Sequence, residues 1–382
     1  ARQVSCEFTL PACDSRPPQV EENVLHFPRL VLPYFEIMKT RILPADDVSL
    51  NEASQLLLAG AIVAFPTETV YGLGGLASRP DSIRAIFAAK GRPATDPLIL
   101  HLPEPDLEKA FADGWVASPL PASAISLAEH FWPGPLTLIL PRGPKASLEM
   151  TAGLDTVAVR HPAHPTARKL LQKVGVPLAA PSANRFGRIS PTDAEAVLQE
   201  LGGSIPLILD GGQCSVGLES TVISLLTPQP EILRPGAVTA AQLEKVLGSP
   251  PVARKISPPK DGAQIAPGQL DSHYAPQTPL YLCETPLRDF HPDFFHILFR
   301  KNSESPSQTS LCLAEDGKLE SAARELYRGL RLADQSGCKA ILVEPVPDGP
   351  WAEALRDRLT RASVGTARRN GTDWKLLSRK RV

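Results

Sequence analysis

A short turn in the first half of the chain, Lys90-Gly91-Arg92-Pro93-Ala94-Thr95-Asp96-Pro97, places two cations one residue apart. Each proline fixes its own backbone and disfavours helical geometry in the residue before it, so the turn holds both side chains in a nearly constant relation. A lysine and an arginine presented together are suited to clamp a polyphosphate. On spacing alone, a solvated helix end with cations that complement the helix dipole is the favoured alternative.

A glycine-rich segment follows a predicted buried strand at residues 65–75, with the sequence FPTETVYGLGG. Gly72, Gly74 and Ala77 match the G-x-G-x-x-A pattern of dinucleotide-binding proteins. The match is weak, because the strand ends at Phe65 and the next helix begins only after Pro80, so we do not favour nicotinamide binding. The G-x-x-x-x-G-K-[ST] pattern occurs nowhere in the sequence, which excludes a P-loop NTPase.

Small hydroxyl and amide residues follow another predicted strand, in the sequence Pro181-Ser182-Ala183-Asn184 and again at Ser190. At the carboxyl end of a strand such residues let a ligand approach the backbone and donate to phosphate or ribose. They also favour helix caps and turns, so both interpretations stand. Ser220, Arg234 and Arg160 add a hydroxyl and two cations at further loop–strand junctions.

Length and composition narrow the class of protein. The chain has 382 residues, enough for two domains, and its 43% hydrophobic and 21% charged content is typical of a globular protein. A net charge of -1 argues against a protein that mainly coats nucleic acid. The six cysteines have no C-x-x-C or zinc-finger spacing, which favours reduced thiols in a cytoplasmic protein without a metal centre. We see no signal peptide, and no apolar run is long enough to cross a membrane.

Apolar runs predict the elements that must position these residues. We expect one α/β domain over residues 38–247. Its predicted strands are 61–65, 98–102, 136–140, 156–160, 177–180, 207–209, 221–225 and 231–234. Its predicted helices are 51–59, 81–90, 164–174 and 192–201.

The rest of the chain divides into four further parts. Residues 1–37 read as an extension that we expect to be poorly ordered, and residues 248–279 as a proline-rich linker or lid, since seven prolines lie between 249 and 279. Strands at 280–283, 310–314 and 340–343, with helices at 319–335 and 351–362, predict a small domain over 280–364. Residues 365–382 read as a basic solvated tail, with weak tRNA contact as the less favoured alternative.

Taken together, the motifs resemble a known family. PTETVYGLG, KGRP with a following His, WPGPLTLIL, VAVRHPAH, APSAN, ESTVI and LRPG occur in this order over about 200 residues, and SHYAP lies in the linker. The first domain resembles the YrdC-like domain, and residues 40 to about 364 resemble the two-domain (Sua5 type) threonylcarbamoyl-AMP synthases. The resemblance implies a twisted, mixed-sheet YrdC-like domain with a central cavity, and a small three-layer Rossmann-like α/β domain beyond the linker.

Members of this family are nucleotidyltransferases that condense L-threonine, bicarbonate (or CO2) and ATP into threonylcarbamoyl-adenylate, diphosphate and water. A tRNA threonylcarbamoyl-transfer complex then uses the product to make t6A at position 37 of tRNAs that read ANN codons. Mg2+ is expected with ATP, and no tightly bound organic cofactor. The sequence offers no Ser-His-Asp or Cys-His arrangement, so positioning, which contributes up to roughly 7–11 kcal/mol, and charge neutralisation would carry the rate.

The resemblance also implies roles for individual residues. Lys90 and Arg92 would be catalytic. The residues implied in threonine binding are Thr69, His101, Arg160, Ala180 through its backbone, and Ser220. Those implied in ATP binding are Arg92, Asp96, Thr156, Ser182, Ser190, Arg234 and Tyr274, the last as part of a lid. Family members often carry asparagine where Asp96 stands, so this carboxylate would contact ATP either directly or through the metal.

Two other functions are open to the same residues. An RNA-binding or ribosome-associated module would use the cations of the cavity, but the net charge and the lack of aromatic residues interleaved with the cations near Lys90 argue against it. A carbamoyl-handling domain of the hydrogenase-maturation kind is the other. Those domains sit in larger chains with zinc-type cysteine motifs, which this sequence lacks.

Overall fold

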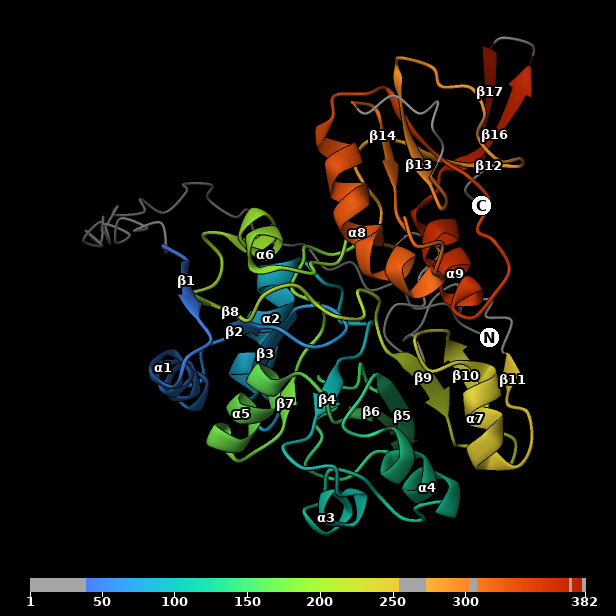
Figure 1. Ribbon diagram of the computed structural model, residues 1–382. Helices are drawn as coiled ribbons and strands as arrows, with labels where there is room; N and C mark the ends of the chain where they lie inside the picture. The colour runs from blue at the N-terminus through green and yellow to red at the C-terminus, as the bar shows by residue number, and fades with distance from the viewer. Residues whose placement is uncertain (1–38, 254–272, 302–307, 371–372, 380–382) are drawn as a thin grey trace, which may run out of the picture. The chain divides into compact units, whose positions relative to one another are not determined.

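The computed structural model describes residues 39–253, 273–301, 308–370 and 373–379 (Figure 1). All of them belong to one compact unit. The predicted extension over residues 1–37 and residues 254–272 of the predicted linker lie outside the described residues.

A mixed sheet of eleven strands, in the order β1-β8-β2-β3-β7-β4-β6-β5-β9-β10-β11, occupies the first domain (Figure 1). The strands are β1 (Arg41–Pro44), β2 (Val63–Phe65), β3 (Gly72–Leu76), β4 (Ile99–His101), β5 (Leu136–Pro141), β6 (Thr156–Arg160), β7 (Leu178–Ala179), β8 (Leu207–Asp210), β9 (Thr221–Ser224), β10 (Glu231–Arg234) and β11 (Val252–Ala253). Strand β4 pairs in parallel with β6 and antiparallel with β7. The predicted α/β domain with a mixed sheet is confirmed.

Helices cover both faces of this sheet. They are α1 (Asp47–Leu58), α2 (Pro80–Lys90), α3 (Leu107–Ala112), α4 (Ala122–Phe131), α5 (Pro165–Val174), α6 (Ala194–Leu201) and α7 (Ala240–Leu247). Val63 and Phe65 of β2 share a hydrophobic cluster with residues of α1 and α5, whereas Ala64 packs in a cluster that contains residues of α2. Because successive side chains of a strand point to opposite faces, α1 and α5 cover one face and α2 covers the other.

The glycine-rich segment that follows the predicted strand is itself a strand. Gly72 to Leu76 form β3, which pairs antiparallel with β2 and is buried throughout. A Cβ atom at Gly74 would stand 2.6 Å from Cε1 of Phe65, and one at Gly75 would stand 3.0 Å from Cβ of Ser82 on α2. The glycines therefore let β3 lie close to its neighbours, and they form no dinucleotide-binding loop.

A second sheet, in the order β14-β13-β15-β12-β16-β17, forms the C-terminal domain. Its strands are β12 (Leu280–Cys283), β13 (Phe294–Leu298), β14 (Ser310–Cys312), β15 (Ala340–Val343), β16 (Gly365–Asn370) and β17 (Asp373–Ser378), and its helices are α8 (Leu319–Gln335) and α9 (Ala352–Ala362). Strands β12 to β16 pair in parallel, and β17 pairs antiparallel with β16. Strand β13 was not predicted.

Both helices of this domain pack on the same face of its sheet. Ile341 and Val343 of β15 share one hydrophobic cluster with residues of α8 and α9. Leu342, which points the other way, belongs to a cluster with Leu287 and Trp374 that contains no residue of either helix. Among the described residues the domain therefore has two layers, not the three that we expected.

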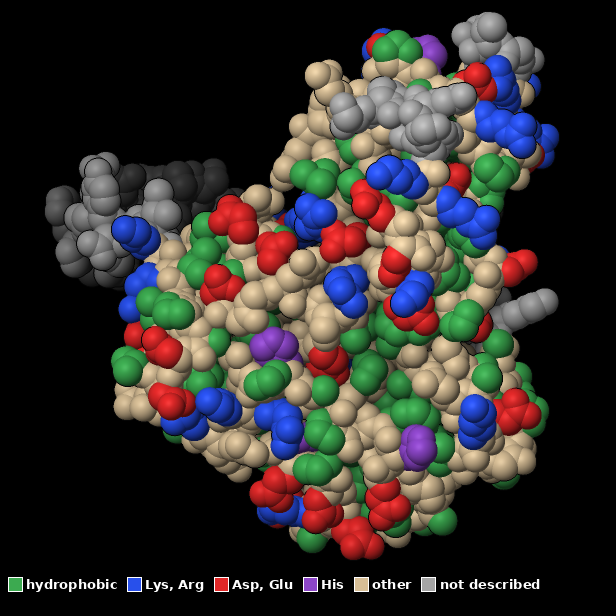
Figure 2. Space-filling view, viewed as in Figure 1, with side chains coloured by type: hydrophobic (Ala, Val, Ile, Leu, Met, Phe, Trp, Pro, Cys, Tyr) green, Lys and Arg blue, Asp and Glu red, His purple; other side chains and the backbone are tan. Residues whose placement is uncertain are grey.

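Our expectation of a solvated basic tail was wrong for residues 365–370 and 373–378, which form the paired strands β16 and β17. Trp374 and Leu376 pack against the hydrophobic cluster on the helix-free face of the sheet. Arg368 pairs with Glu284 and Arg369 with Asp289, so two of the cations are neutralised locally. Over most of the face seen in Figure 2, acidic and basic side chains are interspersed, in keeping with the net charge of -1.

Candidate active site

A polar pocket lies on one face of the large sheet, where β4, β6 and β10 end. With the solvent at its mouth it encloses about 520 Å³ of atom-free space. Its wall consists of Thr67, Thr69, Val70, Gly72, Arg92, Ile99, His101, Arg160, Ala180, Pro181, Ser182, Glu219, Ser220, Arg234, His273 and Tyr274. All five residues predicted to bind threonine are among them, with Arg92, Ser182, Arg234 and Tyr274 of the predicted ATP contacts.

Arg160 closes strand β6 at one side of the pocket. The parallel register pairs it with His101, the last residue of β4, so the two side chains lie on the same face of the sheet. Its Nη2 donates to Oε1 of Glu68 at 2.5 Å, its Nη1 to Oγ1 of Thr69 at 3.0 Å, and its Nε to the carbonyl oxygen of Gly134 at 3.2 Å. These three hydrogen bonds fix the orientation of the Arg160 guanidinium in the part of the pocket that also contains His101.

His101 is a neutral hydrogen-bonding group. Burial, and then the charge of Arg160, lower the pKa of His101 to about 3. Its Nδ1 lies 3.1 Å from the carbonyl oxygen of Ile99. Because a carbonyl only accepts, the neutral ring carries its proton on Nδ1 and leaves Nε2 as an acceptor.

Two further arginines, Arg92 and Arg234, line the same pocket. The Nε of Arg234, which ends β10, donates to the carbonyl oxygen of Ser220 at 3.1 Å, and its Nη2 to Oγ of Ser220 at the same distance. The hydroxyl of Ser220 also lies 2.7 Å from that of Thr137 on β5. Arg92 follows α2 and donates to the carbonyl oxygens of Asp96 and Pro97 at 3.0 and 2.8 Å.

Asp96 does not reach the pocket wall. Its side chain is fully buried and pairs with the guanidinium of Arg92 at 2.9 Å. The carboxylate therefore neutralises and orients Arg92 from behind. An acidic residue can therefore stand near the predicted phosphate-binding residues, because its carboxylate contacts Arg92 and does not line the pocket.

Lys90 is not part of the pocket wall either, and it is the last residue of α2, not a residue of the turn. Gly91 ends the helix in the left-handed region, at φ 60°, and turns the chain toward Arg92. The Nζ of Lys90 donates to the carbonyl oxygens of Ser182, at 2.6 Å, and Asn184. Lys90 thus fastens α2 to the loop that carries Ser182, and a direct catalytic role for its ammonium stays a prediction.

Two further predicted ATP contacts lie outside the pocket wall. Thr156 begins β6, four residues from Arg160 and on the same face of the sheet, roughly 13 Å along the strand. The hydroxyl of Ser190 donates to Oε1 of Glu219 at 2.6 Å. A nucleotide that extends along this face would reach Thr156. The ATP-binding roles of Thr156 and Ser190 stay predictions.

Sequence reasoning missed two titratable residues of the pocket wall, Glu219 and His273, and also Glu68, which pairs with Arg160. Each stands directly beside a predicted contact, within the motifs PTETV, ESTV and SHYAP. Glu68 is the counter-ion of Arg160, which was predicted from another motif, whereas Glu219 pairs with Arg358, which no motif predicted. Burial raises the pKa of Glu219, but Arg358 and Arg234 outweigh it and lower this pKa to about 2, so the carboxylate is ionised. A carboxylate with no assigned role, next to motifs rich in cations, was the sequence signal that could have identified the two glutamates.

Two buried histidines should make the fold sensitive to acid. Burial lowers the pKa of His101 and of His273 to about 3, below the ordinary value of 6.5. Between these values the unfolded chain binds protons that the folded chain does not, so the free energy of unfolding falls as the pH drops below 6.5. We expect each histidine to contribute about 2 kcal/mol to the loss between pH 7 and pH 5.

Urea unfolding at the two pH values checks this expectation. The variant His273→Gln should lose less stability on acidification than the original protein. His130→Gln, which replaces an exposed histidine at the end of α4, should lose the same amount as the original protein. Equal losses in all three proteins would contradict the prediction.

Within the residues that the structure describes, no helix is long and apolar enough to cross a membrane.

Comparison with known proteins agrees with the fold and the pocket. The family model described as "Telomere recombination" matches residues 55–236, and that described as "Threonylcarbamoyl-AMP synthase, C-terminal domain" matches residues 238–364. The threonylcarbamoyl-AMP synthase of Bacillus subtilis is 39% identical over 341 residues, which cover 85% of this chain and 95% of that protein. The corresponding protein of Pyrococcus abyssi is 38% identical over 332 residues, 83% of this chain and 95% of its own.

Among solved structures, Pyrococcus abyssi Sua5 in complex with L-threonine superposes with a TM-score of 0.76 at 35% sequence identity, covering 87% of this chain and 99% of that chain. The large mixed sheet and its arginine-lined pocket thus define an enzyme with a YrdC-like catalytic domain. The two-domain match specifies it further. The chain belongs to the threonylcarbamoyl-AMP synthase family.

Proposed function

We propose that this chain condenses L-threonine, bicarbonate (or CO2) and ATP into threonylcarbamoyl-adenylate, with release of diphosphate and water. The observation that carries the proposal is that three buried arginines line one pocket, which we divide into two parts by their neighbours. Arg160 stands beside neutral His101 in one part, and Arg92 and Arg234 stand in the other. A small zwitterion suits the first part and a polyphosphate the second.

The first part offers a partner for each polar group of threonine. The guanidinium of Arg160 binds the carboxylate, and Nε2 of His101 accepts from the ammonium or the hydroxyl. The N–H of Ala180 already donates to the carbonyl oxygen of Ile99 at 2.9 Å, so its carbonyl is the backbone group that remains to accept from the ammonium. The hydroxyl groups of Thr69 and Ser220 complete this part of the pocket. With its low pKa, His101 orients threonine and does not serve as the base at neutral pH.

The second part neutralises charge during adenylate formation. The carbamate of threonine attacks the α-phosphorus of ATP, the bond to the bridging oxygen breaks, and diphosphate leaves with the electron pair. Arg92 and Arg234 stabilise the charge that develops on the phosphate oxygens. Ser182 and Tyr274 lie on the pocket wall, where they contact the nucleotide. No covalent bond to the protein is needed.

We propose Mg2+ as the ion that accompanies ATP. Within the described residues no group of three His, Cys, Asp or Glu side chains could hold a metal ion. Mg2+ commonly keeps several waters and binds through the phosphates of a nucleotide, so it fits this pocket without such a group.

Diphosphate release tests the proposed reaction. We expect release that requires both L-threonine and bicarbonate, together with a product of the mass of threonylcarbamoyl-AMP. Release at the same rate without threonine would overturn the proposal. The product would then serve a tRNA threonylcarbamoyl-transfer complex that makes t6A at position 37 of tRNAs reading ANN codons, which addition of such a complex and tRNA to the assay can check.

Replacing the buried carboxylate beside Arg92 distinguishes its two possible roles. In Asp96→Asn, we expect the Mg2+ concentration for half-maximal diphosphate release to stay within about two-fold of the original value, because the side chain faces Arg92 and not the pocket. The thermal midpoint should fall, since Arg92 loses its buried counter-ion. A several-fold higher Mg2+ requirement would instead show a role through the metal.

A further inference from the structure

The C-terminal domain contacts a carboxylate of the pocket wall. Oε2 of Glu219, a residue of the pocket wall, accepts from the hydroxyl of Tyr327 on α8 and from Nε of Arg358 on α9, both at 2.8 Å. Nη2 of Arg358 also donates to the carbonyl oxygen of Pro235 at 3.1 Å, beside Arg234. Two helices of one domain thus converge on a single wall residue of the other.

This contact is buried and charged. The side chain of Arg358 is completely buried, and that of Glu219 is 8% exposed. Asp357 supplies a second carboxylate to Arg358 at 2.6 Å. In such surroundings an ion pair resists separation, because removing one partner would leave the other buried without a counter-charge.

The same two side chains hold the aromatic part of the pocket wall. The ring of Tyr274 stacks on that of Tyr327, with 5.8 Å between centroids and 29° between planes. The guanidinium of Arg358 lies over the Tyr274 ring, 5.2 Å from its centroid. Tyr274 has φ 62°, an uncommon conformation for a residue with a side chain, so packing must hold it there.

Glu219 connects these side chains of the C-terminal domain to two residues predicted to contact the substrates, Ser190 and Ser220. Its Oε1 accepts from the hydroxyl of Ser190 at 2.6 Å, and its chain neighbour is Ser220. The loop before it is also clamped. Val216 donates to the carbonyl oxygen of Glu68, and a Cβ atom at Gly217 would stand 2.5 Å from Cα of Arg324 on α8.

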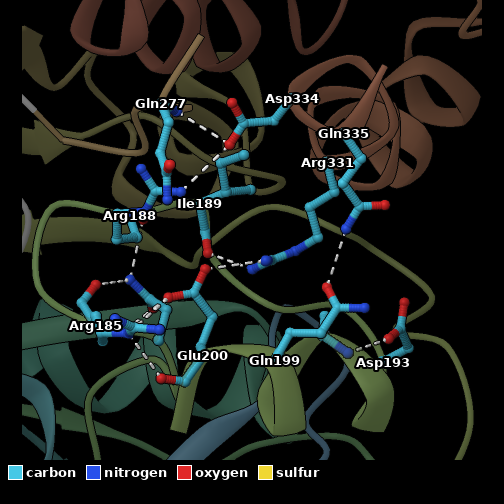
Figure 3. A network of polar contacts seen from close by, with 12 residues as sticks. Arg185, Arg188, Ile189, Asp193, Gln199, Glu200, Gln277, Arg331, Asp334 and Gln335 are labelled. Carbon is cyan, nitrogen blue, oxygen red and sulfur yellow. Dashed lines mark hydrogen bonds and ion pairs between the residues drawn. The ribbon is translucent and has the colours of Figure 1, made fainter. Parts of the chain in front are cut away.

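A second set of contacts between the domains lies apart from the pocket wall (Figure 3). Arg188 pairs with Asp334 of α8 at 3.2 Å, and Arg331 of α8 pairs with Glu200 of α6 at 3.0 Å. Figure 3 shows these side chains facing one another across the contact, with Gln335 directed at Gln199. None of these side chains belongs to the pocket wall, although Arg331 also donates to the carbonyl oxygen of Ile189, the chain neighbour of Ser190.

We propose that Arg358, with Tyr327, is a positioning residue for the reaction: the C-terminal domain uses it to set Glu219 and Tyr274 in the pocket wall and so fixes Ser190 and Ser220. The inference rests on the proposed function for the identity of the substrates. In its own right it assigns the C-terminal domain a part in building the pocket. The first domain alone would leave Glu219 without two of its three side-chain partners.

Steady-state kinetics of the full chain test the proposal, with variants of graded severity. Tyr327→Phe removes only one hydroxyl from Glu219. We expect it to raise the KM values for threonine and ATP by roughly three- to ten-fold, with a smaller change in kcat and a thermal midpoint close to the original. Arg358→Ala should have a larger effect, and Arg358→Lys should restore part of it, because lysine keeps the charge but not the planar fork.

Arg188→Ala is the matched control, since it also removes an arginine that forms an ion pair between the domains. We expect its KM values to stay within about two-fold of the original, as its contact with Asp334 is partly solvated. The proposal is overturned if Tyr327→Phe and Arg358→Lys leave both KM values unchanged, or if Arg188→Ala raises them as much as Arg358→Ala does.

Direct binding separates this inference from the proposed reaction. Calorimetry with a non-hydrolysable ATP analogue and with threonine gives dissociation constants that do not depend on turnover. If the original protein binds both ligands and the variants bind them more weakly, the positioning role holds even where diphosphate release fails. Unchanged dissociation constants in Tyr327→Phe and Arg358→Ala would overturn the positioning role while leaving the proposed reaction intact.

Discussion

Replacement of Arg160 by alanine is expected to lower kcat/KM for threonine by at least about 100-fold, the largest effect of any single change in the pocket. The guanidinium is almost fully buried, so its attraction for a carboxylate is screened little by solvent. Its loss also leaves the carboxylate of Glu68 without its buried counter-ion. Threonine-dependent diphosphate release at varied threonine and saturating ATP measures the effect.

Two variants separate the binding of threonine from general damage. Arg160→Lys keeps the charge but cannot reproduce three donors in one plane, so we expect a loss of roughly ten-fold. Arg84→Ala removes an exposed arginine of α2 and should keep full activity. If Arg160→Ala changes the KM for ATP and leaves that for threonine untouched, the assignment of this part of the pocket to threonine is wrong.

Replacement of Arg92 by alanine is expected to lower kcat/KM for ATP by about 10- to 100-fold, since each hydrogen bond to a charged group is worth about 1.5–3 kcal/mol. Arg92 lies on the pocket wall and Asp96 holds it from behind, so the positive charge faces the substrate in a set direction. Diphosphate release at varied ATP measures the loss.

The change at Arg92 also leaves Asp96 buried without its guanidinium, which by itself destabilises the fold. The double variant Arg92→Ala/Asp96→Asn removes that charge. We expect it to recover much of the thermal stability while kcat/KM for ATP remains low. Recovery of activity together with stability would mean that Arg92 acts on the fold and not on the nucleotide.

Local patterns in the sequence determined much of the catalytic domain. A buried strand needs a short apolar run bounded by chain breakers, and β6 and β10 meet that condition, so their predicted bounds match the observed ones. Helix α2 was predicted to within one residue because Pro80 starts it and Gly91 stops it. The resemblance to the family also named nine of the sixteen residues of the pocket wall, and several of them lie at the ends of such strands.

Other features depend on partners far away in the sequence. The sequence of the turn after α2 does not show that Lys90 and Arg92 have different positions relative to the pocket. The fold directs Lys90 to the loop at Ser182 and Arg92 to the pocket, because Gly91 reverses the chain between them. The C-terminal segment was predicted to be a tail because basic residues dominate its sequence. Trp374 and Leu376 contact apolar residues only once the sheet has formed.

The pocket as a working site was likewise decided by tertiary structure. The register of β4 on β6 brings His101 beside Arg160, although 59 residues separate them in the chain. The ion pair of Glu219 with Arg358 spans 139 residues and two domains. Residue types and their order therefore determined which chemistry the chain can carry out. The long-range packing of buried charges against their counter-ions decided which of those residues face the substrates and which hold the others in place.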